Sequence, residues 1–140
     1  MTEETPEQKF YITTPIYYVN DKPHIGSAYT TIAADVLARF HRARGIDTWF
    51  LTGTAEHGSK IAESAEKAGV EIQEFVDSNS AKFKLAWNRL NISHDDFIRT
   101  TEQRHIDAVN IFFGKLKESG KLYEGDYEGW YCVGCESFKT

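Results

Sequence analysis

The chain has 140 residues, the size of one ordinary domain, and 41% of them are apolar, with enough aromatic residues to bury a core. Its net charge of −5 argues against a broad basic surface for nucleic acid. No apolar run approaches the roughly 18 residues that a membrane-spanning helix needs, so we expect no membrane segment. The acidic, polar start MTEETPEQK is unlike a signal or transit peptide, and it predicts a flexible tail over residues 1–9 of a cytoplasmic protein.

Residues 10–53 have the pattern of one β-α-β unit. Phe10–Thr14 is a short β-rich run, and Ala28–Arg44 has the 3.6-residue period of an amphipathic helix. Asp47–Thr52 is a second β-rich run, which ends at Gly53. A helix between two strands of this kind predicts a right-handed crossover and therefore an α/β fold.

The helix expected over Ala28–Arg44 has an apolar side and a charged side. The apolar residues at 3,4 spacing are Tyr29, Ile32, Ala33, Val36, Leu37 and Phe40. On the opposite side lie Asp35, Arg39, Arg42 and Arg44, and the spacing of Asp35 and Arg39 favours an ion pair. We expect the apolar side to face the core and the charged side to face solvent.

The rest of the chain predicts more helices and one more strand. Helices are expected over Lys60–Ala68, Glu71–Leu90 and Glu102–Ser119, and a third strand over Asp95–Thr101. The inward side of the last helix is expected to comprise Ile106, Val109, Phe112, Phe113 and Leu116. That of the helix before it is expected to comprise Ile72, Phe75, Val76, Phe83, Trp87 and Leu90.

The loop between the first strand and the first helix, TTPIYYVNDKPHIGS, carries the most chemistry. A helix N-terminus leaves backbone N–H groups unpaired and attracts phosphate. Gly26 lets a ligand approach the backbone, and His24 can donate a ring N–H to a phosphate oxygen as negative charge builds on the phosphorus. The alternative is an ordinary loop that closes onto a helix cap, and the residues Pro23 to Gly26 alone favour this alternative.

Further strings in the sequence point to one family. The loop lacks both Gly-x-Gly-x-x-Gly and Gly-Lys-Ser/Thr, but His24, Ile25, Gly26 and Ser27 resemble the His-Ile-Gly-His signature of class I aminoacyl-tRNA synthetases. The strings PIYYVNDKPHIGSAYTTIAADVLARFHRARG, FLTGTAEHGSKI, DDFIRTT and YEGDYEGWYCVGC follow in the order typical of methionyl-tRNA synthetases. The chain therefore resembles this family from about residue 10 to its end.

The resemblance implies a domain organisation. Residues 10–121 would form the first half of a Rossmann-like, parallel-sheet nucleotide-binding catalytic domain. Residues 122–140 would begin an inserted connective-peptide domain that contains a zinc knuckle. There Cys132 and Cys135 form a Cys-x-x-Cys pair, which supplies half of a four-ligand Zn²⁺ site. A redox pair and two inert cysteines are the alternatives.

The resemblance also implies a reaction and its residues. ATP, accompanied by Mg²⁺, would activate methionine to methionyl-adenylate, and the methionyl group would pass to tRNA(Met). His24 would be the catalytic residue and would bind the nucleotide together with Gly26 and Ser27. The amino-acid pocket would comprise Pro15, Ile16, Tyr18 and Ala55. Alternatively, Ile16, Tyr17 and Tyr18 are core residues at a strand end.

Two residues depart from the family pattern. Ser27 stands where the signature usually has His, although Ser can still cap a helix. Ala55 stands where methionyl-tRNA synthetases usually carry the Asp that receives the substrate's ammonium group. We therefore expect weakened methionine binding. His57 is expected to pack or hydrogen-bond near the site, and the remaining histidines carry no motif.

Activity of the 140 residues alone is a separate question. The family needs a second signature, a Lys-Met-Ser-Lys-Ser-like loop, which does not occur between residues 1 and 140. We expect little or no aminoacylation by this chain alone. The alternatives are another class I synthetase, a non-catalytic binding or interaction module derived from a synthetase, and a small zinc-dependent structural module. The sequence does not indicate an oligomeric state.

Overall fold

The computed structural model describes residues 8–132, 134–135 and 137–139. These residues divide into two compact units, with the boundary between Ile106 and Asp107. Residues 1–7 of the predicted tail lie outside the described part, and Lys9 already belongs to the first strand. In the part of the chain that the structure describes, every helix is too short or too polar to cross a lipid bilayer.

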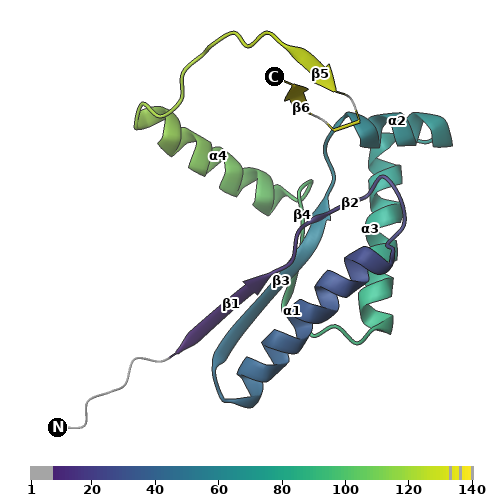
Figure 1. Cartoon of the computed structure of the whole chain (residues 1–140), viewed down its shortest axis with the longest axis vertical. Coiled ribbons are helices and arrows are strands. Elements are labelled where there is room, and N and C mark those ends of the chain that lie inside the picture. Colours follow the sequence, from purple (N-terminus) through teal and green to yellow (C-terminus); the bar gives the residue numbers. More distant parts are fainter. Residues whose placement is uncertain (1–7, 133, 136, 140) are drawn as a thin grey trace. The chain divides into compact units, whose positions relative to one another are not determined.

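A parallel sheet forms the centre of the first unit (Figure 1). It contains β1 (Lys9–Thr13), β2 (Tyr17–Tyr18), β3 (Asp47–Ala55) and β4 (Asp96–Arg99). Along one edge, β3 pairs with β4, which contacts both Leu51 and Thr54. Along its other edge, β3 pairs with β1 at Leu51 and with β2 at Thr54. The predicted β-α-β unit is confirmed as a parallel pair of strands joined by a helix, whereas β2 was not expected.

A bulge separates β1 from β2. Thr13 pairs with Leu51 and Tyr17 with Thr54, so three residues on one strand stand opposite two on the other. Pro15 lies in the bulge. Proline has no backbone N–H, and at this unpaired position the sheet needs no hydrogen bond from it. The bulge brings β2 beside the carboxyl end of β3, where Tyr18 pairs with Ala55.

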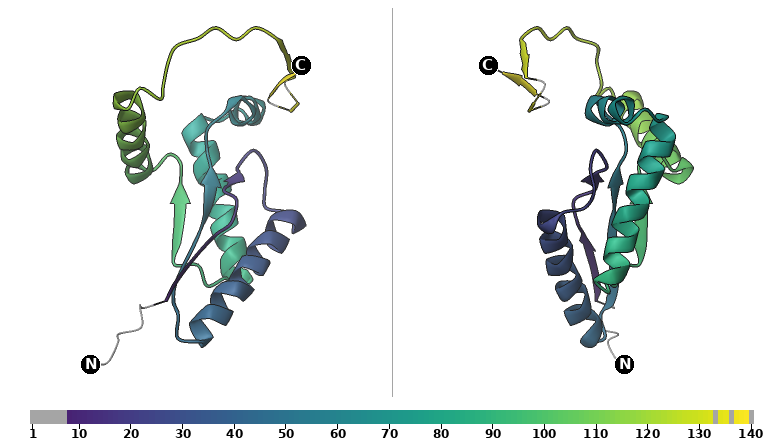
Figure 2. Two further views of the ribbon diagram at one scale, coloured as in Figure 1. Left: turned by 60° about the vertical axis from the view of Figure 1, so that its left-hand side comes forward. Right: turned by 90° about the vertical axis from the view of Figure 1, so that its right-hand side faces the viewer.

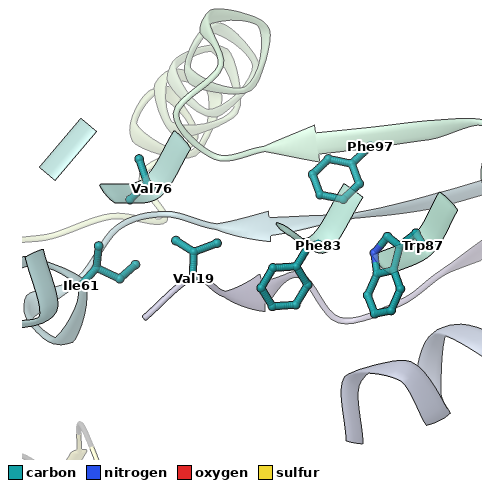
Figure 3. Packing of buried hydrophobic residues seen from close by; sticks show 6 residues of the cluster. All are labelled: Val19, Ile61, Val76, Phe83, Trp87 and Phe97. Atoms are coloured by element: carbon teal, nitrogen blue, oxygen red, sulfur yellow. The ribbon is translucent and has the colours of Figure 1, made fainter. Parts of the chain in front are cut away.

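Helices α2 (Ser59–Ala68) and α3 (Ile72–Arg89) agree with the predicted ranges to within one residue at each end. The helix α2 ends at Gly69, whose φ of 70° is the left-handed conformation that glycine adopts readily. Together with β2 and β4 these helices enclose the main core (Figure 3), which comprises Val19, Ile61, Val76, Phe83, Trp87 and Phe97.

Both long helices of the first unit, α1 (Ile25–Ala43) and α3, cover one face of the sheet (Figure 2). Phe50 of β3 packs with α1, and Phe97 of β4 packs with α3. Phe97 pairs with Thr52, two residues beyond Phe50, so both rings lie on the same face. The opposite face carries the paired residues Tyr11 and Trp49, which are 61% and 52% exposed.

The prediction of which side of α1 is buried was wrong. The predicted core residues Tyr29, Ile32, Val36, Leu37 and Phe40 are between 42% and 77% exposed. The buried side carries small residues instead, among them Thr31, Ala34 and Ala38. Small side chains let the helix lie close to β3, where Ala34 and Ala38 contact Phe50.

The charged side of α1 is bonded to the loop after α3. Asp35 pairs with Arg39 as predicted, at 2.7 Å, but its carboxylate also accepts the Ser93 N–H at 2.7 Å. Arg42 donates to the Ser93 carbonyl at 2.9 Å and pairs with Asp95. These polar bonds explain why the charged side packs inward, because each buried charge has a partner.

The second unit contains most of α4 (Gln103–Glu118) and a hairpin of β5 (Trp130–Cys132) and β6 (Ser137–Lys139). The range of α4 matches the prediction to within one residue at each end. Its predicted inward side was wrong, because no α4 residue is buried and Phe112 is 65% exposed. The antiparallel pairing of β5 and β6 was not expected.

Replacing Gly53 tests how tightly β3 and β4 approach. A Cβ atom on Gly53 would lie 2.0 Å from the Ile98 carbonyl oxygen, which belongs to the paired backbone and cannot rotate away. Gly53→Ala should therefore destabilise the fold by at least about 2 kcal/mol in a denaturation experiment followed by circular dichroism. The control is Gly114→Ala in α4, where an added Cβ meets nothing within 4 Å. Equal stability of the two variants would contradict the packing described here.

Candidate functional site

The candidate site begins at the N-terminus of α1, three residues earlier than predicted. His24 is the N-cap, and its Nδ1 accepts the Gly26 N–H at 3.0 Å. Because Nδ1 is an acceptor, the ring proton of a neutral His24 is on Nε2. The exposed His24 ring can therefore donate an N–H to a ligand, as the sequence predicted, whereas the Gly26 N–H is already used within the cap.

Gly26 and Ser27 hold the His24 ring and backbone in place. A Cβ on Gly26 would lie 2.9 Å from His24 Cε1, so a larger residue here would push the exposed ring away from its present position. The Ser27 hydroxyl accepts the His24 N–H at 3.1 Å and donates to the His24 carbonyl at 2.8 Å. Ser27 stands at the position where the signature usually has histidine. Its buried side chain completes the cap at the N-terminus of α1.

A cavity of about 420 Å³ lies beside this cap. It brings together Tyr18, His24 and Ser27, which the sequence assigned to two different ligand sites. Four other residues of the predicted nucleotide and amino-acid sites do not line it: Pro15, Ile16, Gly26 and Ala55. Pro15 and Ile16 are exposed on the bulge that precedes β2.

Several lining residues of the cavity were missed. Asn20, Asp21 and Lys22 lie between β2 and the cap, and a polar run next to the motif was the signal for them. Phe83 lines the cavity from α3. It is far in sequence from the other lining residues, so no local sequence pattern indicates that it lies beside them. Tyr17 also lines it, and its hydroxyl bonds to Thr31 Oγ1 at 2.8 Å, which ties β2 to α1.

Ala55 is the last residue of β3 and is half-buried beside Tyr18. It offers only a methyl group to a ligand. The carboxylate of the next residue, Glu56, is not accessible to a ligand, because its side chain is fully buried and bonded within the protein. Its oxygens accept from Thr54 Oγ1 at 2.7 Å and from the Arg99 guanidinium at 2.7 and 2.8 Å.

The Glu56–Arg99 pair is the centre of a wider network. Arg99 also pairs with Asp77 of α3. The Glu56 backbone N–H donates to Thr100 Oγ1 at 2.8 Å, and His57 Nε2 lies 3.1 Å from the Thr100 carbonyl. The expected hydrogen bond of His57 is thereby confirmed, although His57 does not line the cavity.

Burial and hydrogen bonds act on Glu56 in opposite directions. Burial alone raises the pKa of its carboxyl group, but hydrogen bonds from Arg99, Thr101 and Thr54 outweigh it, so the pKa lies below the usual 4.5. The same pair raises the pKa of Arg99. Both groups are therefore charged at neutral pH.

The two cysteines lie on the second unit. Cys132 ends β5 and is half-buried, whereas Cys135 is exposed in the turn before β6. Among the described residues, no group of three or more His, Cys, Asp or Glu is arranged to hold a metal ion. The predicted zinc ligands thus form at most half of a site within those residues.

Comparison with known proteins identifies the family. The family model described as "tRNA synthetases class I (M)" matches residues 10–140. The chain belongs to the class I methionyl-tRNA synthetase family. It is 58% identical to the methionine–tRNA ligase of Thermotoga maritima over 130 residues, which are 93% of this chain and 21% of that protein. It is 52% identical to the Streptomyces coelicolor ligase over 99% of this chain and 26% of that protein.

Solved structures of synthetases agree with this assignment. The Mycobacterium tuberculosis methionyl-tRNA synthetase in complex with methionyl-adenylate is 43% identical, with a TM-score of 0.90 over 94% of this chain and 26% of that one. A leucyl-tRNA synthetase of Agrobacterium radiobacter, 22% identical with a TM-score of 0.81, shares the fold. The predicted α/β class is confirmed. The methionyl-tRNA synthetase match decides against the other class I synthetases, and the chain spans about a fifth to a quarter of its curated relatives.

The Glu56–Arg99 pair predicts how stability depends on pH. Because the pKa of Glu56 is lowered by folding, its contribution is complete above pH 4.5 and is lost as the pH falls through the folded pKa. Glu56→Gln should cost about 3 kcal/mol at pH 7, because Arg99 loses its buried partner, and should reduce the loss of stability in acid. Denaturation from pH 7 down to pH 3 measures both effects.

The exposed Glu63 on α2 provides the matched control for this experiment. Glu63→Gln should leave both the stability at pH 7 and the acid dependence unchanged. If Glu56→Gln behaves like this control, the network at the end of β3 does not stabilise the fold.

Proposed function

We propose that this chain supplies the first half of the site in which a methionine–tRNA ligase makes methionyl-adenylate. The observation that carries the proposal is the cavity in which Tyr18 of β2 meets His24 and Ser27 of the α1 cap. Membership of the methionyl family supports it, as does the likeness to the M. tuberculosis enzyme in complex with methionyl-adenylate. In the proposed reaction the methionine carboxylate attacks the α-phosphorus of ATP and pyrophosphate leaves. The methionyl group then passes to the 3′-terminal adenosine of tRNA(Met).

His24 is the proposed catalytic residue of the first step. Its Nε2–H would donate to a phosphate oxygen while negative charge builds on the phosphorus, and the bond from Gly26 to Nδ1 holds the required tautomer. Gly26 and Ser27 position this ring at the positive end of α1. Mg²⁺, bound with ATP, would neutralise phosphate charge.

The amino-acid side of the proposed site comprises Pro15, Ile16, Tyr18 and Ala55. Tyr18 lines the cavity and pairs with Ala55, and the bulge holds Pro15 and Ile16 three and two residues before Tyr18. Ala55 offers no charge to the methionine ammonium group, and Glu56 is committed to Arg99. We therefore infer that the chain binds methionine weakly.

The second unit would contribute half of a zinc site. Cys132 and Cys135 stand on the β5–β6 hairpin at the spacing that binds one tetrahedral Zn²⁺, and the insertion begun by residues 122–140 would supply two further ligands. The hairpin and the accessible Cys135 fit this role. A bound Zn²⁺ would stabilise the fold of the insertion.

A non-catalytic binding module is the second candidate function. Ala55 favours it, because the resemblance implies a carboxylate at this position for the methionine ammonium group, and a methyl group cannot take that role. The chain spans 21–26% of the matched ligases, so aminoacylation is proposed for the whole protein. The predicted cytoplasmic location stays a prediction.

Ala55→Asp tests the assignment of the amino-acid site. A carboxylate at this position should raise affinity for a non-hydrolysable methionyl-adenylate analogue roughly a hundredfold, because it pairs with the buried ammonium group. Isothermal titration calorimetry measures the change. A des-amino analogue is the control ligand and should gain nothing. Unchanged affinity for the methionyl compound would contradict the placement of Ala55 at the ammonium end.

Gly26→Ala tests the role of the His24 ring. The added Cβ would displace the ring from its cap, so we expect at least roughly tenfold weaker binding of the adenylate analogue. The helix should remain folded, which circular dichroism checks. Gly114→Ala, remote from the motif in sequence, should bind like the parent chain. Equal binding by Gly26→Ala would show that the cap geometry does not matter.

A further inference from the structure

The segment between β2 and α1 forms one wall of the candidate cavity. Its residues Asn20, Asp21 and Lys22 line the cavity and are exposed. The residue before them, Val19, is fully buried and packs in the main core, close to Phe83 (Figure 3). Val19 is therefore the point at which this exposed wall is attached to the core of the first unit.

A side chain of α3 holds the backbone of Val19. Asn79 Nδ2 donates to the Val19 carbonyl oxygen at 2.7 Å, and Asn79 is only 4% exposed. Val19 comes directly after Tyr18, the last residue of β2 that pairs with β3. Because a buried carbonyl without a donor is costly, the bond from Asn79 stabilises the backbone at the point where it leaves the sheet.

Lys82 determines which end of the Asn79 amide faces Val19. The Lys82 Nζ donates to Asn79 Oδ1 at 2.7 Å, and an ammonium group can only donate hydrogen bonds. The Asn79 oxygen therefore faces Lys82, which leaves the NH₂ group for the Val19 carbonyl. Both ends of the amide have a partner, so the side chain is held in one orientation.

On the other side of Tyr18, the strand β2 is attached to α1. The Tyr17 hydroxyl lies 2.8 Å from Thr31 Oγ1 and 3.2 Å from the Ser27 carbonyl oxygen. Tyr18 thus lies between an attachment to α1 and an attachment to α3. Together these two attachments set the position of Tyr18 relative to the His24 cap, across the candidate cavity.

We propose that Asn79 is a positioning residue for the site of adenylate formation. Asn79 does not line the candidate cavity and acts through the Val19 carbonyl. While this bond is made, the segment from Val19 to Lys22 stays against the core and keeps its wall of the cavity in place. The proposal rests on the proposed function, because the cavity that this segment lines is the candidate adenylate site.

The next residue of α3 offers a matched control. Ser80 is 1% exposed, and its hydroxyl lies 3.2 Å from Thr54 Oγ1 of β3. Ser80→Ala therefore also removes a buried hydrogen bond of α3, but one that holds the sheet rather than the segment after β2. Comparison of the two positions separates a loss of stability from a loss of position.

The first measurement follows the release of Val19 by thiol labelling. The background variant Val19→Cys/Cys132→Ser/Cys135→Ser carries a single thiol, in the core. Asn79→Leu roughly preserves the size of the side chain, Asn79→Asp preserves the acceptor for Lys82, and both remove the donor. Each should raise the labelling rate at position 19 at least roughly tenfold, because opening of the segment no longer breaks a buried hydrogen bond.

Two controls show whether the effect is local. Val76→Cys in the same cysteine-free background places the thiol elsewhere in the same core cluster, where the parent residue is 1% exposed. Labelling at position 76 in the Asn79 variants, and at position 19 in Ser80→Ala, should stay within about twofold of the background. Urea denaturation of each variant supplies the change in global stability, which is subtracted first.

The second measurement is the affinity of the chain for the non-hydrolysable methionyl-adenylate analogue, by titration calorimetry. Asn79→Leu and Asn79→Asp should each bind at least roughly tenfold more weakly than the parent chain, because the wall beside Tyr18 is no longer held in its binding position. Ser80→Ala should bind within about threefold of the parent chain.

Three results would overturn the proposal: unchanged labelling at position 19 in the Asn79 variants, equal acceleration at positions 19 and 76, or unchanged affinity for the analogue in variants whose segment is released. Labelling needs no ligand. Faster labelling confined to position 19 therefore supports the role of Asn79 in holding the segment even where the analogue fails to bind the parent chain, and that failure counts against the proposed function alone.

Discussion

The buried ion pair between Glu56 and Arg99 is the constraint on which the candidate site depends. It joins the carboxyl ends of β3 and β4 where Gly53 already brings the two backbones together. Because the pair is bidentate and supported by Thr54, it holds the end of β3 at one angle. Ala55 is thereby held in place, and with it the paired strand β2 and one wall of the candidate cavity.

The secondary structure could be predicted from the sequence far better than the packing. Helix ranges were correct to within one residue for α2, α3 and α4, because the apolar period and the glycine stops are local signals. The predictions of which sides of α1 and α4 are buried were wrong, because burial depends on which other elements pack against a helix. The exposed Phe40 of α1 and Trp49 of the sheet agree with a chain that spans about a quarter of its relatives. Parallel sheets are normally covered on both faces.

The candidate site shows the same difference between local signals, which could be predicted, and tertiary contacts, which could not. His24, Gly26 and Ser27 were found from a motif that is contiguous in the sequence, and the structure adds the reason for their order, a reciprocal helix cap. The early start of α1 was missed because histidine is not among the preferred N-cap residues. Phe83 was missed because its contact with the cavity depends on how α3 packs against β2.

The most direct test of a methionine-specific half-site is the melting temperature of the chain with a non-hydrolysable methionyl-adenylate analogue, with the leucyl analogue as control. A ligand that binds only the folded chain raises this temperature by mass action, which corresponds to about 2.7 kcal/mol at a hundred times Kd. We predict a rise with the methionyl compound that the leucyl compound does not produce. No rise with either compound, or an equal rise with both, would contradict a methionine-specific half-site in this chain.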